Sequence, residues 1–174
     1  MAYGVCAYPR LKESDYRIIQ NFRKQHDELY YSFAEPHFSF VFPIREIEKE
    51  EFIDEIIAKT QGSMKIDFEI KCATVNKDAV LDYYHLLLAP DKGFSDVVKL
   101  HDRLYSGIFF EYLRLDIDFI PHMGIANSKD KYKVKKWADE WNQKEFLIKG
   151  TIEKLSIVEL SDDSLIEIMQ IELL

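Results

Sequence analysis

The sequence has few of the residues that staple small secreted domains or hold metal ions. Its 174 residues include two cysteines, six glycines and five prolines. The cysteines, Cys6 and Cys72, have no CxxC spacing and no histidine beside them, which argues against a disulfide framework and against a metal hydrolase. Both lie in apolar, strand-like runs, so we expect two reduced thiols in the core.

Basic residues and long apolar runs are also scarce. The chain has 31 acidic and 23 basic residues and a net charge of −8, which argues against a protein that coats duplex DNA. No apolar run approaches the roughly 20 residues of a membrane span. The first residues, MAYGVCAYPRL, lack the pattern of a signal peptide. We expect a soluble cytoplasmic protein with neither membrane nor duplex DNA as a partner.

The apolar content, 47% of all residues, is enough for a real core, and its periodicity alternates between strands and helices. A period of two predicts strands over 2–10, 35–43, 65–76, 82–90, 116–127, 151–160 and 164–173. A helical period follows candidate N-caps at Ser14 and Ser95 and covers 48–62, closed by Gly62, and 129–146. The last two strands flank SDDS (161–164), which predicts a hairpin.

This order of elements predicts an α+β fold of mostly antiparallel sheet. We expect one bilobal domain over 1–174, with two pseudo-symmetric halves and flanking helices around a central cleft. No linker or low-complexity segment divides it.

The same dipeptide, Pro-His, begins two of the apolar strands. EPHFSFVF (35–42) carries His37, and IPHMGIAN (120–127) carries His122, 85 residues later. A lone histidine at such a place is usually hydrogen-bonded to backbone and has no further role. Its repetition at two strand starts favours a shared function, because two pseudo-symmetric halves would turn both rings towards one cleft.

Alternation along a strand predicts the neighbours of each histidine. His37 and Ser39 share one face of the first strand, and His122, Gly124 and Ala126 share one face of the second. Two opposed imidazoles suit general acid–base chemistry, since one can be neutral while the other is charged. A hydroxyl on the same face can donate to a phosphoryl oxygen as negative charge grows there.

These elements resemble the two-histidine phosphoesterase superfamily, also called 2′-5′ RNA ligase-like or cyclic phosphodiesterases. Its motif, His-x-Thr/Ser-hydrophobic, occurs once in each lobe. HFSF (37–40) matches in full, whereas HMGI (122–125) has Gly124 in place of the hydroxyl. A main-chain N–H or nearby Ser128 is the candidate replacement for the missing donor.

The resemblance implies hydrolysis of 2′,3′-cyclic phosphates or RNA-terminal phosphodiesters without a metal or other cofactor. It implies that His37 and His122 are the acid–base pair and that Ser39 binds a phosphate oxygen. Which histidine is the acid stays open, and so does the choice between hydrolysis and ligation. The absence of a Gly-rich phosphate loop argues against a nucleoside triphosphatase.

Five further residues are candidates for substrate binding. Gly124 lets a ligand approach the backbone, Tyr8 can stack on a base, and Arg10 can contact a phosphate. Lys129 and Lys131 begin the run KDKYKVKK and can steer phosphate in an otherwise acidic protein. The alternatives are a core tyrosine, a surface arginine and a solvated lysine face.

Three functions therefore fit the sequence. We favour a phosphodiesterase whose substrate is a cyclic nucleotide or an RNA end. The second is a non-catalytic module that binds a nucleotide or RNA end and lost activity with the hydroxyl at Gly124. The third is an interaction protein in which the two Pro-His strands are coincidental.

Overall fold

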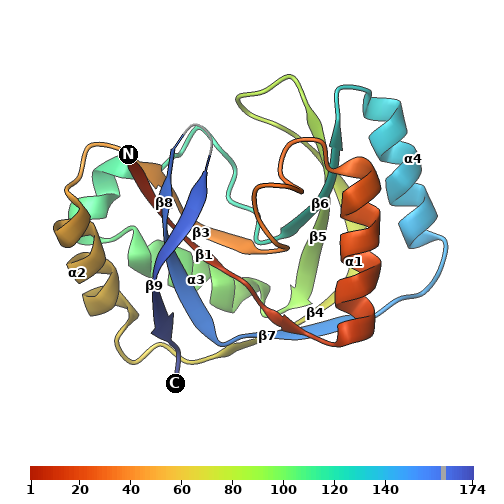
Figure 1. The fold of residues 1–174 in the computed structure, drawn as a ribbon. Helices are drawn as coiled ribbons and strands as arrows, with labels where there is room; N and C mark the ends of the chain where they lie inside the picture. The colour runs from red at the N-terminus through yellow and green to blue at the C-terminus, as the bar shows by residue number, and fades with distance from the viewer. Residues whose placement is uncertain (162–163) are drawn as a thin grey trace.

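Two antiparallel sheets lie side by side in the computed structural model, which describes residues 1–161 and 164–174 (Figure 1). The strands are β1 (Ala2–Ala7), β2 (Arg10–Leu11), β3 (Phe38–Ile44), β4 (Ile66–Lys77), β5 (Tyr84–Lys92), β6 (Met123–Ser128), β7 (Ile148–Ile152), β8 (Lys154–Leu160) and β9 (Leu165–Glu172). The helices are α1 (Glu13–His26), α2 (Lys49–Thr60), α3 (Phe94–Leu104), α4 (Lys131–Asn142) and the 3₁₀ helix η1 (Gly107–Tyr112). The predicted α+β class is confirmed.

Each sheet takes strands from both ends of the chain. In the described residues one sheet has the order β3-β1-β8-β9 and the other β2-β7-β4-β5-β6. The chain passes directly from one sheet to the other after β1, where Pro9 lacks the N–H that a ladder needs, and again at Glu153. It also crosses through the segments that contain α1, between β2 and β3, and α2, between β3 and β4. The strands predicted over 2–10 and 151–160 are therefore each split between the two sheets. The two halves are thus divisions in space rather than in sequence.

Aromatic side chains join the two sheets through their buried faces. Phe38 of β3 and Phe68 of β4 meet edge to face, with ring centroids 5.0 Å apart, and both are at most 1% exposed. Full burial of such a side chain contributes about 2–3 kcal/mol. Helix α1 packs against β6 of the larger sheet, α4 packs across β4, β5 and β6, and α3 packs against β3. The core therefore fixes how the strands that follow the two Pro-His pairs are oriented.

The helix starts differ from those that the serines predicted. Helix α1 begins at Glu13, so Ser14 lies inside it. Helix α3 begins at Phe94, directly after Gly93, which has a φ of 83° and would place a Cβ 2.6 Å from the carbonyl oxygen of Asp67. Only glycine fits that left-handed turn, so the chain enters the helix one residue before Ser95. Gly62, with a φ of 72°, follows α2 as predicted.

One of the two cysteines is not in the core. Cys6 is buried, but Cys72 is exposed. On β4, Ile70 pairs with Pro90 of β5 and Ala73 pairs with Leu88, so β4 carries an extra residue between these two pairs. This bulge breaks the alternation that predicted an inward Cys72. Strand β5 continues through Pro90 to Lys92, whereas the sequence predicted that it ends at Pro90.

The predicted C-terminal hairpin is confirmed. Strands β8 and β9 pair from Lys154 with Glu172 to Leu160 with Leu165. Asp162 and Asp163 of the predicted turn lie outside the described residues. Within the described chain no helix is long and apolar enough to cross a membrane.

Candidate functional site

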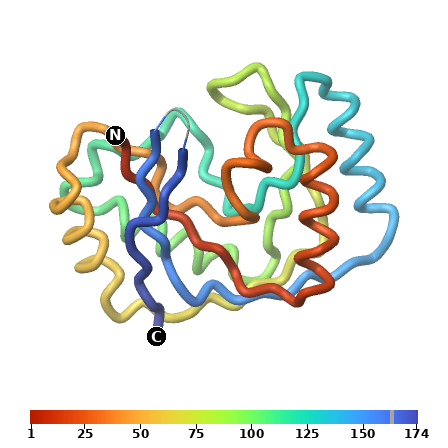
Figure 2. Tube along the Cα trace, viewed as in Figure 1, coloured from red at the N-terminus to blue at the C-terminus, as the bar shows by residue number. Residues whose placement is uncertain are grey.

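The two Pro-His pairs lie just before β3 and β6, the strands that they were predicted to begin. Figures 1 and 2 show the first residues of β3 and β6 between the two sheets, near the middle of the molecule. In each pair the proline is buried and the histidine ring is half-buried. The same local structure therefore occurs once beside each sheet.

Both histidines make the same hydrogen bond. The Nδ1 of His37 lies 2.7 Å from the carbonyl oxygen of Glu35, and the Nδ1 of His122 lies 2.5 Å from that of Ile120. A carbonyl oxygen only accepts, so each Nδ1 carries the proton and donates it. In the neutral ring this leaves Nε2 with a free lone pair, ready to accept a proton.

The electrostatics of the site favour the neutral form of both rings. The pKa of His122 is lowered to about 4, mainly because the ring is buried. The hydrogen bond to Ile120 raises this pKa, and positive charge on His37 and His85 lowers it further. Burial also lowers the pKa of His37. Since the charge of His37 acts on His122, the two rings lie within electrostatic reach of each other. An anion placed between them would raise the pKa values of both.

Ser39 and Tyr8 lie beside His37. Ser39 pairs with Cys6 across β1 and β3 and is half-buried, and no hydrogen bond among the described residues uses its hydroxyl. The Tyr8 ring meets the His37 ring edge to face, with ring centroids 5.9 Å apart. Burial raises the pKa of Tyr8, so its ring is neutral. The structure thus brings Tyr8 together with the first motif.

Gly124 is exposed, and a Cβ added there meets no atom within 4 Å. Gly124 pairs with Leu87 and Ala126 with Leu86, so Ile125 is an extra residue in a bulge. Neighbours on β5 point to opposite faces, and the prediction that Gly124 and Ala126 share a face is therefore wrong. Ser128 pairs with Tyr84 and is also on the Ala126 side, which excludes it as the replacement donor.

Beyond Gly124, the same face carries two residues that sequence reasoning passed over. They are Asn127, which is 1% exposed, and His85, which pairs with it across β5 and β6. The Nε2 of His85 lies 2.7 Å from a carboxylate oxygen of Asp78. The Tyr30 ring is stacked on the His85 ring at an interplanar angle of 21°, with centroids 6.2 Å apart. Simple alternation from Gly124 would place Asn127 on the opposite face of β6. The bulge at Ile125 shifts the register by one residue and brings Asn127 to the same face as Gly124.

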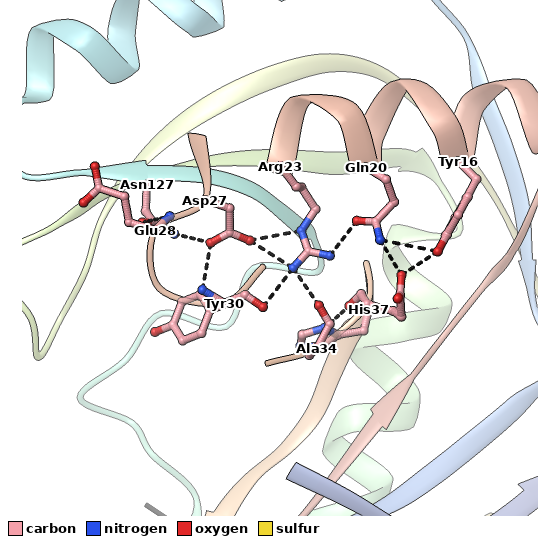
Figure 3. A network of polar contacts seen from close by, with 10 residues as sticks. Tyr16, Gln20, Arg23, Asp27, Glu28, Tyr30, Ala34, His37 and Asn127 are labelled. Carbon is pink, nitrogen blue, oxygen red and sulfur yellow. Dashed lines mark hydrogen bonds and ion pairs between the residues drawn. The ribbon is translucent and has the colours of Figure 1, made fainter. Parts of the chain in front are cut away.

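The polar contacts of Asn127 reach the segment that carries His37 (Figure 3). Its side-chain amide donates to Asp27 at 2.6 Å, and its carbonyl accepts the backbone N–H of Glu28 at 3.1 Å. Asp27 is paired in turn with Arg23 of α1 at 2.9 Å. The strand after His122 and the loop before His37 are therefore joined by buried polar contacts.

The remaining candidates lie apart from the histidines. The Nε of Arg10 donates to Glu153 at 3.0 Å, and Arg10 lines a surface cavity of about 390 Å³ between β2, β7 and β4. Lys129 is exposed, with its Nζ 5.5 Å from the Tyr83 ring centroid, and Lys131 begins α4. The structure brings none of these three into contact with either histidine ring.

Metal ligands do not gather at the site. In the described part of the chain, no group of three or more His, Cys, Asp or Glu side chains is placed to hold a metal ion. Independence from metals stays a prediction for experiment.

Comparisons with known proteins identify the family. The family model of the 2′-5′ RNA ligase superfamily matches residues 10–164. No curated protein matches the sequence. The chain belongs to the 2′-5′ RNA ligase superfamily, the two-histidine phosphoesterases that the motifs predicted.

Solved structures share the fold over almost the whole chain. TT0787 of Thermus thermophilus is 13% identical, with a TM-score of 0.60 over 99% of this chain and 98% of its own. LigT of E. coli complexed with NADP+ is 8% identical, with a TM-score of 0.59 over 99% and 96%. Usb1 of Kluyveromyces marxianus is 9% identical, with a TM-score of 0.56 over 99% and 98%. At these identities the likeness shows the fold alone.

Proposed function

We propose that this protein is a metal-independent phosphodiesterase that acts on a 2′,3′-cyclic nucleotide or an RNA-terminal phosphate. One observation supports the proposal above all. Two Pro-His pairs, 85 residues apart, each donate an Nδ1 proton to the carbonyl two residues earlier and leave an Nε2 free. Family membership supports chemistry at a phosphodiester. LigT of E. coli was also solved in complex with a nucleotide, 3′-AMP.

The reaction needs one proton acceptor and one proton donor. The Nε2 of one neutral histidine takes a proton from the attacking water as its oxygen bonds to phosphorus. The other histidine is protonated, and the proton on its Nε2 is transferred to the ribose oxygen as the P–O bond breaks. Both rings favour the neutral form in the free protein, so the negative phosphate supports the protonation of one of them. Each positioned acid or base typically contributes about 10²–10⁴ in rate.

In this proposal Ser39 donates its hydroxyl proton to a phosphoryl oxygen. On the opposite side of the phosphate, the open space at Gly124 leaves its main-chain N–H as the replacement for the missing hydroxyl. Tyr8, beside His37, contacts the nucleoside. Lys129 and Lys131 steer the anion electrostatically at longer range, and Arg10 contacts a more distant part of an RNA chain.

A second function is favoured by one residue. Gly124 lacks the second hydroxyl, and loss of one such donor typically costs about 10²–10³ in rate. A non-catalytic module that binds a nucleotide or RNA end would keep the histidines and the open space at Gly124. It differs from the enzyme in one respect, that bound nucleotide is never turned over.

Phosphorus NMR separates these two functions. A panel of 2′,3′-cyclic nucleotides is incubated with the wild-type protein and with His37→Ala and His122→Ala, all in EDTA. The proposal expects a monoester product with the wild type and none with either variant, and the spectra also identify which ester forms. Binding without turnover by the wild type would favour the binding module. Turnover that EDTA abolishes would contradict a metal-independent mechanism.

A further inference from the structure

A buried ion pair lies at the end of α1, beside the segment that carries His37. The side chains of Arg23 and Asp27 are 1% and 3% exposed, and Arg23 Nη2 lies 2.9 Å from Asp27 Oδ2 (Figure 3). Arg23 Nε donates to the same oxygen at 3.0 Å. Burial of two charges costs several kcal/mol of desolvation, and well-packed apolar residues often replace such a pair without loss of stability. Stability alone therefore gives a poor account of the pair.

The contacts of Arg23 hold the loop that leads to His37. Its Nη2 donates to the carbonyls of Ala34 at 2.7 Å and Tyr30 at 3.2 Å, and its Nη1 donates to Gln20 at 2.9 Å. The next residue along, Glu35, supplies the carbonyl that accepts the Nδ1 proton of His37. Arg23 thus fixes the backbone directly before the acceptor that orients the His37 ring.

The carboxylate of Glu35 is held from the same helix. It accepts hydrogen bonds from the hydroxyl of Tyr16 at 2.6 Å and from the amide of Gln20 at 2.5 Å. Gln20 therefore contacts both Arg23 and Glu35 and links the two sets of contacts (Figure 3). Helix α1 holds the approach to His37 at two successive residues.

Asp27 carries these contacts over to the other sheet. Its Oδ1 accepts from the side-chain amide of Asn127 at 2.6 Å and from the backbone N–H of Tyr30 at 3.0 Å. Asn127 belongs to β6, the strand that begins directly after His122, and shares the Gly124 face. Both ends of the Asn127 amide face this loop, since its carbonyl also accepts from the N–H of Glu28.

We propose that Arg23, Asp27 and Asn127 are positioning residues that set the loop carrying His37 against the strand that follows His122. None of the three is needed at the phosphate itself. Their role is to keep the two Nε2 atoms at a fixed separation on opposite sides of the substrate. The catalytic part of this proposal rests on the proposed phosphodiesterase function, whereas the structural coupling does not.

The test uses the opposite charges of the pair. The charged and titratable groups around His37 are Arg23 of α1, Asp27 directly after α1, Tyr8 directly after β1 and His122 directly before β6. Arg23 lowers the pKa of His37 and Asp27 raises it. We expect Arg23→Gln to raise the NMR titration midpoint of His37 and Asp27→Asn to lower it. A loss of packing alone has no reason to move the midpoint in opposite directions.

Positioning is read from two further signals. Both variants should shift the ring resonances of His122 as well as those of His37, because the contacts join both segments. With a 2′,3′-cyclic nucleotide, kcat should fall by about 10²-fold and KM should change much less, since misplacement by about 1 Å costs that factor. Arg17→Gln is the matched control, because Arg17 forms an exposed ion pair with Glu13 on the same helix. It should leave all three signals unchanged.

Arg23→Lys covers the case in which Arg23→Gln does not fold. Lysine keeps the positive charge but lacks the guanidinium nitrogen that donates to the Ala34 carbonyl. The titration midpoint of His37 should therefore be unchanged, while kcat falls. Midpoints that move in the same direction in Arg23→Gln and Asp27→Asn, or His122 resonances that do not respond, overturn the proposal. If the wild type has no activity, the phosphodiesterase function fails, while the NMR signals still decide the coupling.

Discussion

The lowered pKa of His122 makes the stability of the protein depend on pH in a defined direction. Burial lowers the pKa from 6.5 to about 4 in the folded protein, whereas the unfolded chain keeps the ordinary value. Between these values the unfolded state binds more protons, so acid favours unfolding. The contribution is complete above about pH 6.5 and is lost as the pH falls towards 4. His37, whose pKa burial also lowers, contributes with the same sign.

The two pKa values set the size of the effect. At pH 4.5 the unfolded ring is almost fully protonated and the folded ring is mostly neutral, which corresponds to roughly 2–3 kcal/mol. Carboxylates titrate in the same range, so the wild type must be compared with a variant that has no titrating ring. His122→Gln keeps a polar side chain there. Urea unfolding at pH 7.5 and pH 4.5, followed by the fluorescence of Trp137 and Trp141, measures both proteins.

We expect the wild type to lose roughly 2–3 kcal/mol more than His122→Gln between these two pH values. His37→Gln should also reduce the pH dependence. Equal losses in the wild type and His122→Gln would refute the argument, because they would show that the ring titrates alike in the folded and unfolded chains.

Three further outcomes are expected. Gly124→Ser should raise kcat by up to about 10²-fold, since its side chain enters open space and supplies the missing hydroxyl, and it should not lower the melting temperature. An unchanged rate would show that no side-chain hydroxyl is needed at this position. Ser39→Ala should lower kcat by about 10²–10³, with the fold checked by circular dichroism; full activity would remove Ser39 from the mechanism. The exposed thiol of Cys72 should react quickly with a disulfide reagent. Cys6 is buried, with its pKa raised to about 11, and should react only when the protein unfolds. Two fast-reacting thiols per chain would contradict the burial of Cys6.

The sequence carried enough information to predict the family and the two histidines. The Pro-His repeat is local, and in both places the structure repeats one local contact, from Nδ1 to the carbonyl two residues earlier. The α+β class followed from periodicity in the same way, because strand and helix periods are also local. The positions of His37 and His122 near the middle of the molecule follow from the order of the strands.

Features that depend on register or on distant pairing were not predictable in this way. The bulges at Ile125 and after Ile70 reverse the alternation, which is why Ala126 and Cys72 were assigned to the wrong faces. Arg23 and Asp27 have the spacing of an ordinary exposed pair on a helix. In the fold both are buried, and Asp27 accepts a hydrogen bond from Asn127, which lies 100 residues further along the chain.

The central claim is that His37 and His122 act as one catalytic unit, and a double-variant comparison tests it most directly. The rate with a 2′,3′-cyclic nucleotide in EDTA is measured for the wild type, His37→Ala, His122→Ala and the double variant. If the two rings exchange protons in one step, the double variant should be no slower than the slower single variant, because either loss already disables the unit. Losses that multiply in the double variant, or a single variant with near wild-type activity, would contradict the two-histidine mechanism.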